Sequence, residues 1–276
     1  MRIDAHQHFW HYDPIEYGWI GDTMQPLKRD YLPDDLRPLL EQPGVSATIA
    51  VQARQSVAET DWLLELADRH TWIKGVVGWV NLLSPHVRDE LERYAGHPKL
   101  CGIRHIVQDE PDDRFMLRPD FLRGLSLLEA FNLPYDLLLF PKHLPVAVEV
   151  VKQFPQQRFV LDHLAKPAIR AGSFSPWDAD IRALSRCENV ACKLSGLVTE
   201  AVWQQWQPGD FRRYLDHIMD CFGPDRLMFG SDWPVCTLSG TYADVVRLIE
   251  EYLAAFPVDV QARIWGDNAA RWYALA

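Results

Sequence analysis

Eight short apolar runs, each followed by a helical segment or a long loop, constrain the fold more than any other feature of the sequence. The first run covers residues 1–9, and the others cover 47–53, 73–80, 100–107, 134–140, 158–164, 190–196 and 227–233. Segments between them, such as 60–70 and 210–222, carry apolar residues at helical spacing. Buried strands that alternate with helices over about 250 residues are typical of a (β/α)₈ barrel. The sequence therefore predicts a single TIM-type α/β barrel domain over residues 1–276.

An open, doubly wound α/β sheet is the alternative for this pattern of strands and helices. Such a sheet would require a glycine-rich turn after an early strand, and the sequence has no turn of this kind. The chain of 276 residues is also long enough to bury one large core. These two observations favour the barrel.

The net charge and the cysteine content limit the binding partners and the cellular compartment that we expect for this protein. The net charge of −10 argues against a nucleic-acid surface, which needs a basic stripe, and disfavours a highly anionic substrate. No apolar run approaches the roughly 20 residues of a membrane helix, and we expect no secretory signal. The five cysteines show neither zinc-finger nor redox spacing. We therefore expect a cytoplasmic protein that acts on a small molecule, without a nucleic-acid or membrane partner.

Polar side chains gather at the predicted strand ends, where the active site of a barrel lies. His6 and His8 end the first strand on the same face, because alternate side chains of a strand point the same way. The other strand-end groups are Gln52, Trp79, Arg104, His105, His163, Lys193, Ser195 and Asp232. Of Arg104 and His105, only one can face the cavity. Buried ionisable groups are costly unless they are paired, so their convergence indicates a functional site.

The histidines and Asp232 suit two kinds of chemistry. Asp232 can take a proton from water and so act as a general base. His6, His8 and His163 can donate hydrogen bonds to a developing oxyanion, or they can hold a divalent metal ion together with Asp232. Such a set of nitrogen and oxygen ligands suits zinc.

Four motifs together point to a known family. They are His-x-His at 6–8, Asp-His-x-x-Lys-Pro at 162–167, Lys-Leu-Ser-Gly at 193–196 and Gly-Ser-Asp-Trp-Pro at 230–234. In these motifs, and over essentially its whole length, the chain resembles the amidohydrolase superfamily. Within that superfamily it is most similar to the branch of sugar-lactone and 2-pyrone-dicarboxylate hydrolases. The stretch 193–200, with Trp203 beyond it, resembles the L-fuconolactonase group most closely.

The resemblance implies hydrolysis of a sugar lactone, such as L-fuconolactone, to the aldonic acid. It implies catalytic roles for His6, His8, His163 and Asp232, the same four residues being the ligands of any metal. The candidate substrate contacts are Gln52, Trp79, Arg104, His105, Lys166 and Trp233. Binuclear members of the superfamily use a histidine from the fifth strand, which is lacking in 134–140. We therefore predict at most one divalent ion, zinc, and the resembled branch also includes members that work without metal.

Three alternative functions remain open at this point. A 2-pyrone-4,6-dicarboxylate lactonase would share the fold, but its doubly negative substrate should need several arginines, and only Arg54 and Arg104 are suitably placed. A metal-dependent decarboxylase of the same superfamily would need a firmly bound ion. A barrel that binds ligands without catalysis is disfavoured, because the set of site residues looks complete.

Overall fold

Eight parallel strands form a barrel in the computed structural model, which describes residues 1–94 and 96–275. The strands follow one another in chain order and are β1 (Arg2–Gln7), β2 (Val45–Val51), β3 (Ile73–Gly78), β4 (Leu100–His105), β5 (Tyr135–Leu137), β6 (Phe159–Leu161), β7 (Val190–Leu194) and β8 (Leu227–Phe229). A bridge between Gln7 and Trp233 joins the segment after β8 to β1. The predicted (β/α)₈ TIM-type barrel is therefore confirmed.

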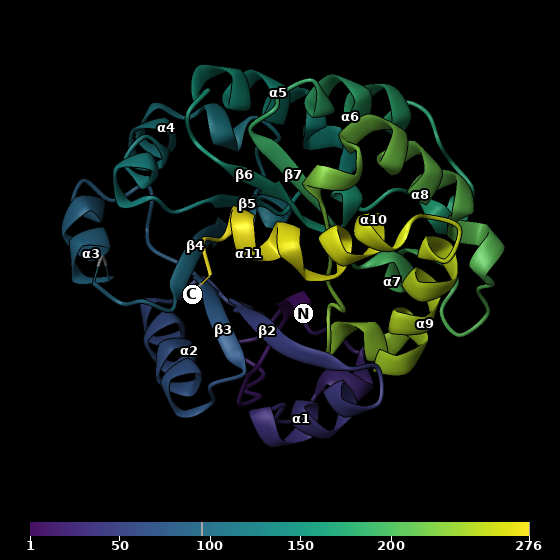
Figure 1. The fold of residues 1–276 in the computed structure, drawn as a ribbon. Coiled ribbons are helices and arrows are strands. Elements are labelled where there is room, and N and C mark those ends of the chain that lie inside the picture. The colour runs from purple at the N-terminus through teal and green to yellow at the C-terminus, as the bar shows by residue number, and fades with distance from the viewer. Residues whose placement is uncertain (95, 276) are drawn as a thin grey trace.

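Helices surround the strands and cover the outside of the barrel (Figure 1). They are α1 (Pro33–Glu41), α2 (Val57–Arg69), α3 (Val87–Tyr94), α4 (Pro119–Leu125), α5 (Leu144–Gln153), α6 (Trp177–Ser185), α7 (Leu197–Glu200), α8 (Pro208–Phe222), α9 (Tyr242–Leu253), α10 (Val258–Ala262) and α11 (Asn268–Trp272). The helical spacing at 60–70 and 210–222 corresponds to α2 and α8. The short helix α7 was not predicted. Within the described ranges, no helix is long and apolar enough to cross a membrane.

The last helices lie across the amino-terminal end of the barrel, where Figure 1 shows α10 and α11 in yellow in front of the strands. The Asn268 amide donates to the carbonyl of Leu227 at the start of β8, at 2.7 Å. Beyond α11, the buried ring of Tyr273 packs among side chains of the barrel interior, such as Val160 and Met228. These contacts seal one end of the barrel and leave the carboxyl-terminal end for a ligand.

Several strands are shorter than their apolar runs. The run at 134–140 yields only β5, and the run at 158–164 yields only β6. The remaining residues leave the hydrogen-bond ladder and turn over the carboxyl-terminal mouth, where Leu138 and Phe140 line a cavity. Strand β1 is irregular after Asp4, whose carboxylate accepts the backbone N–H of His6 at 3.1 Å. The irregular part of β1 and the short strands β5 and β6 therefore lie next to the carboxyl-terminal mouth of the barrel, where side chains line the cavity.

Candidate active site

A cavity of about 350 Å³ opens at the carboxyl-terminal ends of the strands. Its lining comes from the ends of six strands, from the loop before α1 and from the segment around α7. The lining residues are His8, Trp19, Met24, Ala53, Arg104, Ile106, Gln108, Asp109, Leu138, Phe140, His163, Lys166, Thr199, Glu200, Trp203, Asp232, Val235 and Leu238. A volume of this size with mixed apolar and charged walls suits a small polar molecule.

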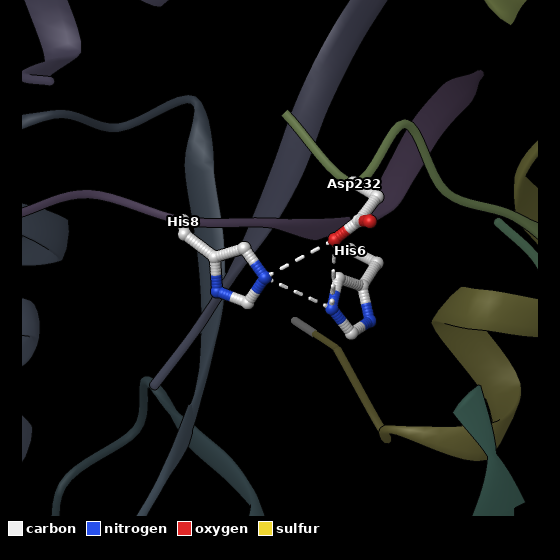
Figure 2. A group of neighbouring side chains, drawn as sticks. All are labelled: His6, His8 and Asp232. Carbon is white, nitrogen blue, oxygen red and sulfur yellow. Dashed lines mark hydrogen bonds and ion pairs between the residues drawn. The ribbon is translucent and has the colours of Figure 1, made fainter. Parts of the chain in front are cut away.

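His6, His8 and Asp232 point toward one another at the base of this cavity (Figure 2). The Nε2 atoms of His6 and His8 lie 3.2 Å apart. The Oδ1 atom of Asp232 lies 3.3 Å from His8 Nε2 and 3.7 Å from His6 Nε2. The backbone fixes this approach, because the Asp232 N–H donates to the His6 carbonyl at 2.8 Å. The predicted same-face placement of His6 and His8 is thus found at the barrel seam.

The spacing of these three atoms fits a single divalent ion. His8 Nδ1 lies 2.8 Å from the Val51 carbonyl, to which it must donate, so a neutral His8 ring presents a lone pair at Nε2. Three lone-pair atoms would then face one another across 3.2–3.7 Å. Zinc–ligand bonds of about 2.0–2.1 Å in a tetrahedral site separate the ligands by roughly 3.3 Å. His6, His8 and Asp232 are therefore placed as ligands for one ion.

His163 approaches the same group from an unusual left-handed turn. His163, Leu164, Ala165 and Lys166 have φ values of 54°, 54°, 56° and 52°. Such conformations cost roughly 1–2 kcal/mol for each residue that has a Cβ. The turn brings both His163 and Lys166 to the cavity and puts His163 Nε2 at 3.8 Å from Asp232 Oδ1. Strain of this kind persists where the surrounding structure holds it in place for function.

The Lys-Leu-Ser-Gly motif supports the His163 ring. The Ser195 hydroxyl lies 2.8 Å from His163 Nδ1 and fixes the orientation of the ring. Gly196 has a φ of +64°, and a Cβ at this position would lie 2.6 Å from His163 Nδ1. Only glycine therefore allows the ring and this turn to pack together.

A buried network of charges lies beneath the cavity. Lys193 Nζ lies 2.6 Å from Asp136 Oδ2 and 2.9 Å from Asp162 Oδ1. Arg104 Nη1 lies 2.9 Å from Asp162 Oδ2, and its other terminal nitrogen donates to the Gln52 carbonyl. The four ionised groups are almost completely buried and neutralise one another in pairs.

Burial and neighbouring charges set the protonation of the site. Burial lowers the pKa of His6 well below its usual value, and it lowers that of His163 to about 4, so both rings are neutral at pH 7. Burial raises the pKa of Asp232, but its interactions with His163 and with His8, including a side-chain hydrogen bond to His8, lower it further than burial raises it. Asp232 is therefore an ionised base beside the neutral rings of His6 and His163.

Of the predicted substrate contacts, two line the cavity and four do not. Arg104 and Lys166 belong to the lining, and Arg104 rather than His105 faces the mouth. Among the described residues the lining does not include Gln52, Trp79, His105 or Trp233.

Each of those four has another set of partners. The Gln52 amide donates to the Arg104 carbonyl at 3.2 Å, and the Trp79 indole faces His105. Neighbouring residues of a strand point to opposite faces, so His105 points away from the cavity that Arg104 lines. There His105 lies 2.6 Å from Glu110 and stacks on the ring of Phe115. Trp233 packs on Phe9 and Tyr31, away from Asp232.

Several residues that line the cavity are not among the predicted site residues. Thr199, Glu200 and Trp203 belong to α7 or follow it, and they line the cavity. The sequence signal for them is the stretch 193–200 with Trp203, which carries the family resemblance but does not by itself assign these side chains to the site. Asp136 was also missed, because one carboxylate in an apolar run gives no periodic signal.

The loop before α1 forms part of the cavity wall and is tied down by Glu59. Trp19 and Met24 of this loop line the cavity. The hydroxyl of Tyr17, in the same loop, donates to Glu59 Oε1 at 3.1 Å. Glu59 Oε2 accepts the backbone N–H groups of Ala53 at 2.9 Å and of the residue that follows it. Burial raises the pKa of Glu59 to about 7 despite these hydrogen bonds.

The raised pKa gives a testable dependence of stability on pH. Between the unfolded pKa of 4.5 and the folded pKa of about 7, the folded protein binds more protons at Glu59. The contribution of Glu59 to stability therefore falls as pH rises through this window. Relative to wild type, the free energy of unfolding of Glu59→Gln should increase by about 3 kcal/mol from pH 4.5 to 7.

Denaturant unfolding at several pH values measures this difference. The exposed Glu41→Gln variant is the control and should keep a constant offset from wild type. An offset for Glu59→Gln that does not change with pH would contradict the assignment.

The comparisons with known proteins agree with this geometry. The amidohydrolase family model matches residues 3–275. An L-fucono-1,5-lactonase from Burkholderia multivorans is 43% identical, over 100% of this chain and 96% of that protein. An L-fucono-1,5-lactonase from Burkholderia ambifaria is 37% identical with the same coverage.

Solved structures show the same relationship. A zinc-bound amidohydrolase from Burkholderia multivorans is 43% identical, covers 100% of both chains and superimposes with a TM-score of 0.96. A probable 2-pyrone-4,6-dicarboxylic acid hydrolase from Acinetobacter baumannii is only 17% identical, with a TM-score of 0.78, and shares the fold. The whole-length family match and these relatives show that the chain belongs to the amidohydrolase family.

Proposed function

We propose that this protein hydrolyses a sugar lactone to the corresponding aldonic acid. The observation that carries the proposal is the ionised Asp232 carboxylate, which lies beside three imidazoles at the base of a cavity of about 350 Å³. The two lactonases that resemble the chain over its whole length support the same reaction. The relatives act on L-fucono-1,5-lactone, and we propose a neutral lactone of this kind as the substrate.

Asp232 acts as the general base in this reaction. Its carboxylate accepts a proton from the water that attacks the lactone carbonyl, and a tetrahedral oxyanion forms. Hydrogen-bond donors at the cavity base, from Arg104 and His163, stabilise the negative charge of the oxyanion. The ring C–O bond then breaks, and the proton held by Asp232 passes to the departing ring oxygen. The product is the open-chain hydroxy acid, and the base is free again.

His6, His8 and Asp232 are the residues that would hold a metal ion, with His163 next to them. A bound divalent ion would polarise the lactone carbonyl and lower the pKa of water. We propose zinc, at no more than one ion per chain, because the ligands are nitrogen and oxygen atoms at tetrahedral spacing. Elemental analysis of the purified protein tests this proposal, and two equivalents per chain would contradict it.

The cavity walls suit a neutral polyhydroxylated ring. Trp19, Phe140 and Trp203 offer flat apolar faces, and Lys166 and Glu200 offer a donor and an acceptor for hydroxyl groups. Burial raises the pKa of Glu200, which shows that its surroundings disfavour negative charge. We also propose a cytoplasmic location, because all five cysteines are free thiols.

A screen of lactones with a pH indicator tests the proposed function. Each aldonolactone, and a dicarboxylated pyrone, is assayed with the protein as purified and after treatment with a chelator. We expect faster turnover of a neutral aldonolactone, because the acidic groups Asp109, Glu200 and Asp232 line the cavity. A kinetic preference for the pyrone would reverse the assignment, and release of CO₂ from a carboxylated substrate would indicate a decarboxylase.

Glu200 gives a prediction about selectivity. A carboxylate on the substrate would meet the Glu200 carboxylate across the cavity, and such repulsion is worth about 1–2 kcal/mol at an effective dielectric of 20. Glu200→Gln should therefore raise kcat/KM for a carboxylated lactone about tenfold relative to a neutral one. The exposed Glu188→Gln is the matched control and should leave this ratio unchanged. An unchanged ratio for Glu200→Gln would remove Glu200 from substrate selection.

A further inference from the structure

Lys166 brings a positive charge to the cavity on a flexible side chain. Its backbone is set by the left-handed turn, with a φ of 52°, but a long flexible stem separates the ammonium group from that backbone. Within residues 1–94 and 96–275, this group forms no ion pair with a carboxylate. Burial raises the pKa of Glu200, and the charge of Lys166 opposes that rise, so the two groups lie within electrostatic reach. A contact other than an ion pair therefore has to orient the ammonium group.

The ring of Phe140 supplies such a contact. Lys166 Nζ lies 5.5 Å from the centroid of the Phe140 ring. A cation within about 6 Å of the ring centroid, over the face of an aromatic side chain, is attracted by the negative charge of that face. Both side chains line the cavity, and Phe140 is only half-buried. The ring is therefore placed to hold the ammonium group at the cavity wall.

His143 in turn holds Phe140. Phe140 is the N-cap of the short helical turn Pro141–His143, and its backbone N–H donates to His143 Nδ1 at 3.1 Å. The two rings have an interplanar angle of 26°, with centroids 6.3 Å apart. Burial lowers the pKa of His143, so the ring is neutral at pH 7 and can accept this hydrogen bond. A side chain that reaches back from the third helical position to the N-cap N–H fixes the entry of the chain into the turn.

We propose that Phe140 positions the Lys166 ammonium group to donate a hydrogen bond to a hydroxyl group of the lactone ring, and that His143 positions Phe140. The inference rests on the proposed function and names the residues that make the cavity select hydroxylated rings. An ammonium group carries only donors, so it binds an oxygen lone pair and not an apolar ring atom. Lys166 contacts the substrate, whereas Phe140 and His143 are positioning residues that act through it.

The position of the ammonium group can be tested without enzymatic activity. Reductive methylation with carbon-13 formaldehyde adds two labelled methyl groups to an accessible lysine amine and preserves its charge. The Lys166 methyl signal, identified by its loss in Lys166→Arg, should be shifted upfield by the ring current of Phe140 relative to that of the exposed Lys152. The shift should disappear in Phe140→Leu and persist in Phe140→Tyr, which keeps the aromatic face. An unshifted signal in wild type, or a shift that remains in Phe140→Leu, would overturn the proposal.

Kinetics on two lactones tests the contact with the substrate. A six-membered aldonolactone and δ-valerolactone share the same ring, but only the aldonolactone carries ring hydroxyls. Phe140→Leu should lower kcat/KM for the aldonolactone by about 3- to 30-fold relative to δ-valerolactone, the range of a cation–π contact, and Phe140→Tyr should restore it. In a Lys166→Met background, Phe140→Leu should change this ratio much less, because no ammonium group remains to be positioned. Equal changes in the two backgrounds would contradict the proposal.

Variants of His143 test the support beneath Phe140. His143→Gln keeps an acceptor for the Phe140 N–H and should retain both the methyl shift and the kinetic ratio, whereas His143→Leu should reduce both in protein that remains folded. Phe154→Leu is the matched control, because Phe154 is a partly buried phenylalanine at the carboxyl end of α5 and does not line the cavity. It should match wild type in both measurements. Identical behaviour of His143→Gln and His143→Leu would overturn the role of His143.

The two measurements separate this inference from the lactonase assignment. A protein that hydrolyses no lactone but shows a methyl shift dependent on Phe140 would refute the assignment and leave the contact between Phe140 and Lys166 standing. A protein that hydrolyses lactones but shows neither the shift nor the change in ratio would refute only the inference.

Discussion

Asp232→Asn is expected to lower kcat by about 10²–10⁴-fold on the best lactone of the screen while the protein stays folded. The amide has the size and shape of the carboxylate but cannot accept the proton of the attacking water. The fold should survive for two reasons. The hydrogen bond that Asp232 makes to the His6 carbonyl comes from its backbone N–H, and its φ of 57° is one that asparagine adopts readily.

Initial rate and melting temperature must be measured on the same sample of this variant. The exposed Asp22→Asn is the control and should match wild type in both. A variant that melts early would indicate that Asp232 mainly anchors the loop after β8. A well-folded variant with near-normal turnover would transfer the role of base to His6, His8 or His163.

Lys193→Met should be the most destabilising single substitution in the network beneath the site. Lys193 is completely buried, and its removal leaves Asp136 without its cationic partner and weakens the charge balance of Asp162. Breaking a buried ion pair in this way costs about 3–5 kcal/mol. For a chain of this size the melting temperature should fall by roughly 10 °C.

The variant that combines Lys193→Met with Asp136→Asn tests the cause of this loss. Removing both charges eliminates the unpaired carboxylate, so the double variant should recover much of the melting temperature. Calorimetry on the three proteins compares them. If Lys193→Met is as stable as wild type, or if the double variant is less stable than Lys193→Met, the ion pair between Lys193 and Asp136 is not what stabilises this region.

The fold could be predicted because the alternation of apolar runs and helical segments is a property of the whole chain. The length of one strand and one unusual turn could not be predicted, because they depend on local backbone conformation. The run at 134–140 gave a strand of only three residues, since Leu138 and Phe140 leave the ladder to line the cavity. Four consecutive left-handed residues at 163–166 have no sequence signal when none of them is glycine.

The site was predicted best where a motif fixes the backbone. His163, Lys166 and Asp232 were found from their motifs, and all three line the cavity. Trp233, a predicted substrate contact, is not among the described residues that line the cavity; it follows the left-handed Asp232 and packs on Phe9. Glu200 was not predicted as a site residue, because it comes from the helix after β7 and not from a strand end. Asp136 was not predicted either, because a buried charge can be recognised only once its partner is known.

The seam between β1 and β8 determines when the site can first exist during protein synthesis. Asp4 accepts a hydrogen bond from the backbone N–H of Ser231, 227 residues further along the chain. At roughly 5–20 residues per second, a ribosome makes Asp232 about 10–50 seconds after His6. Throughout that interval His6 and His8 have no carboxylate partner across the seam. Any binding of a metal ion by these ligands together with Asp232, and any competition between ions for that site, can therefore begin only after nearly the whole barrel has been made.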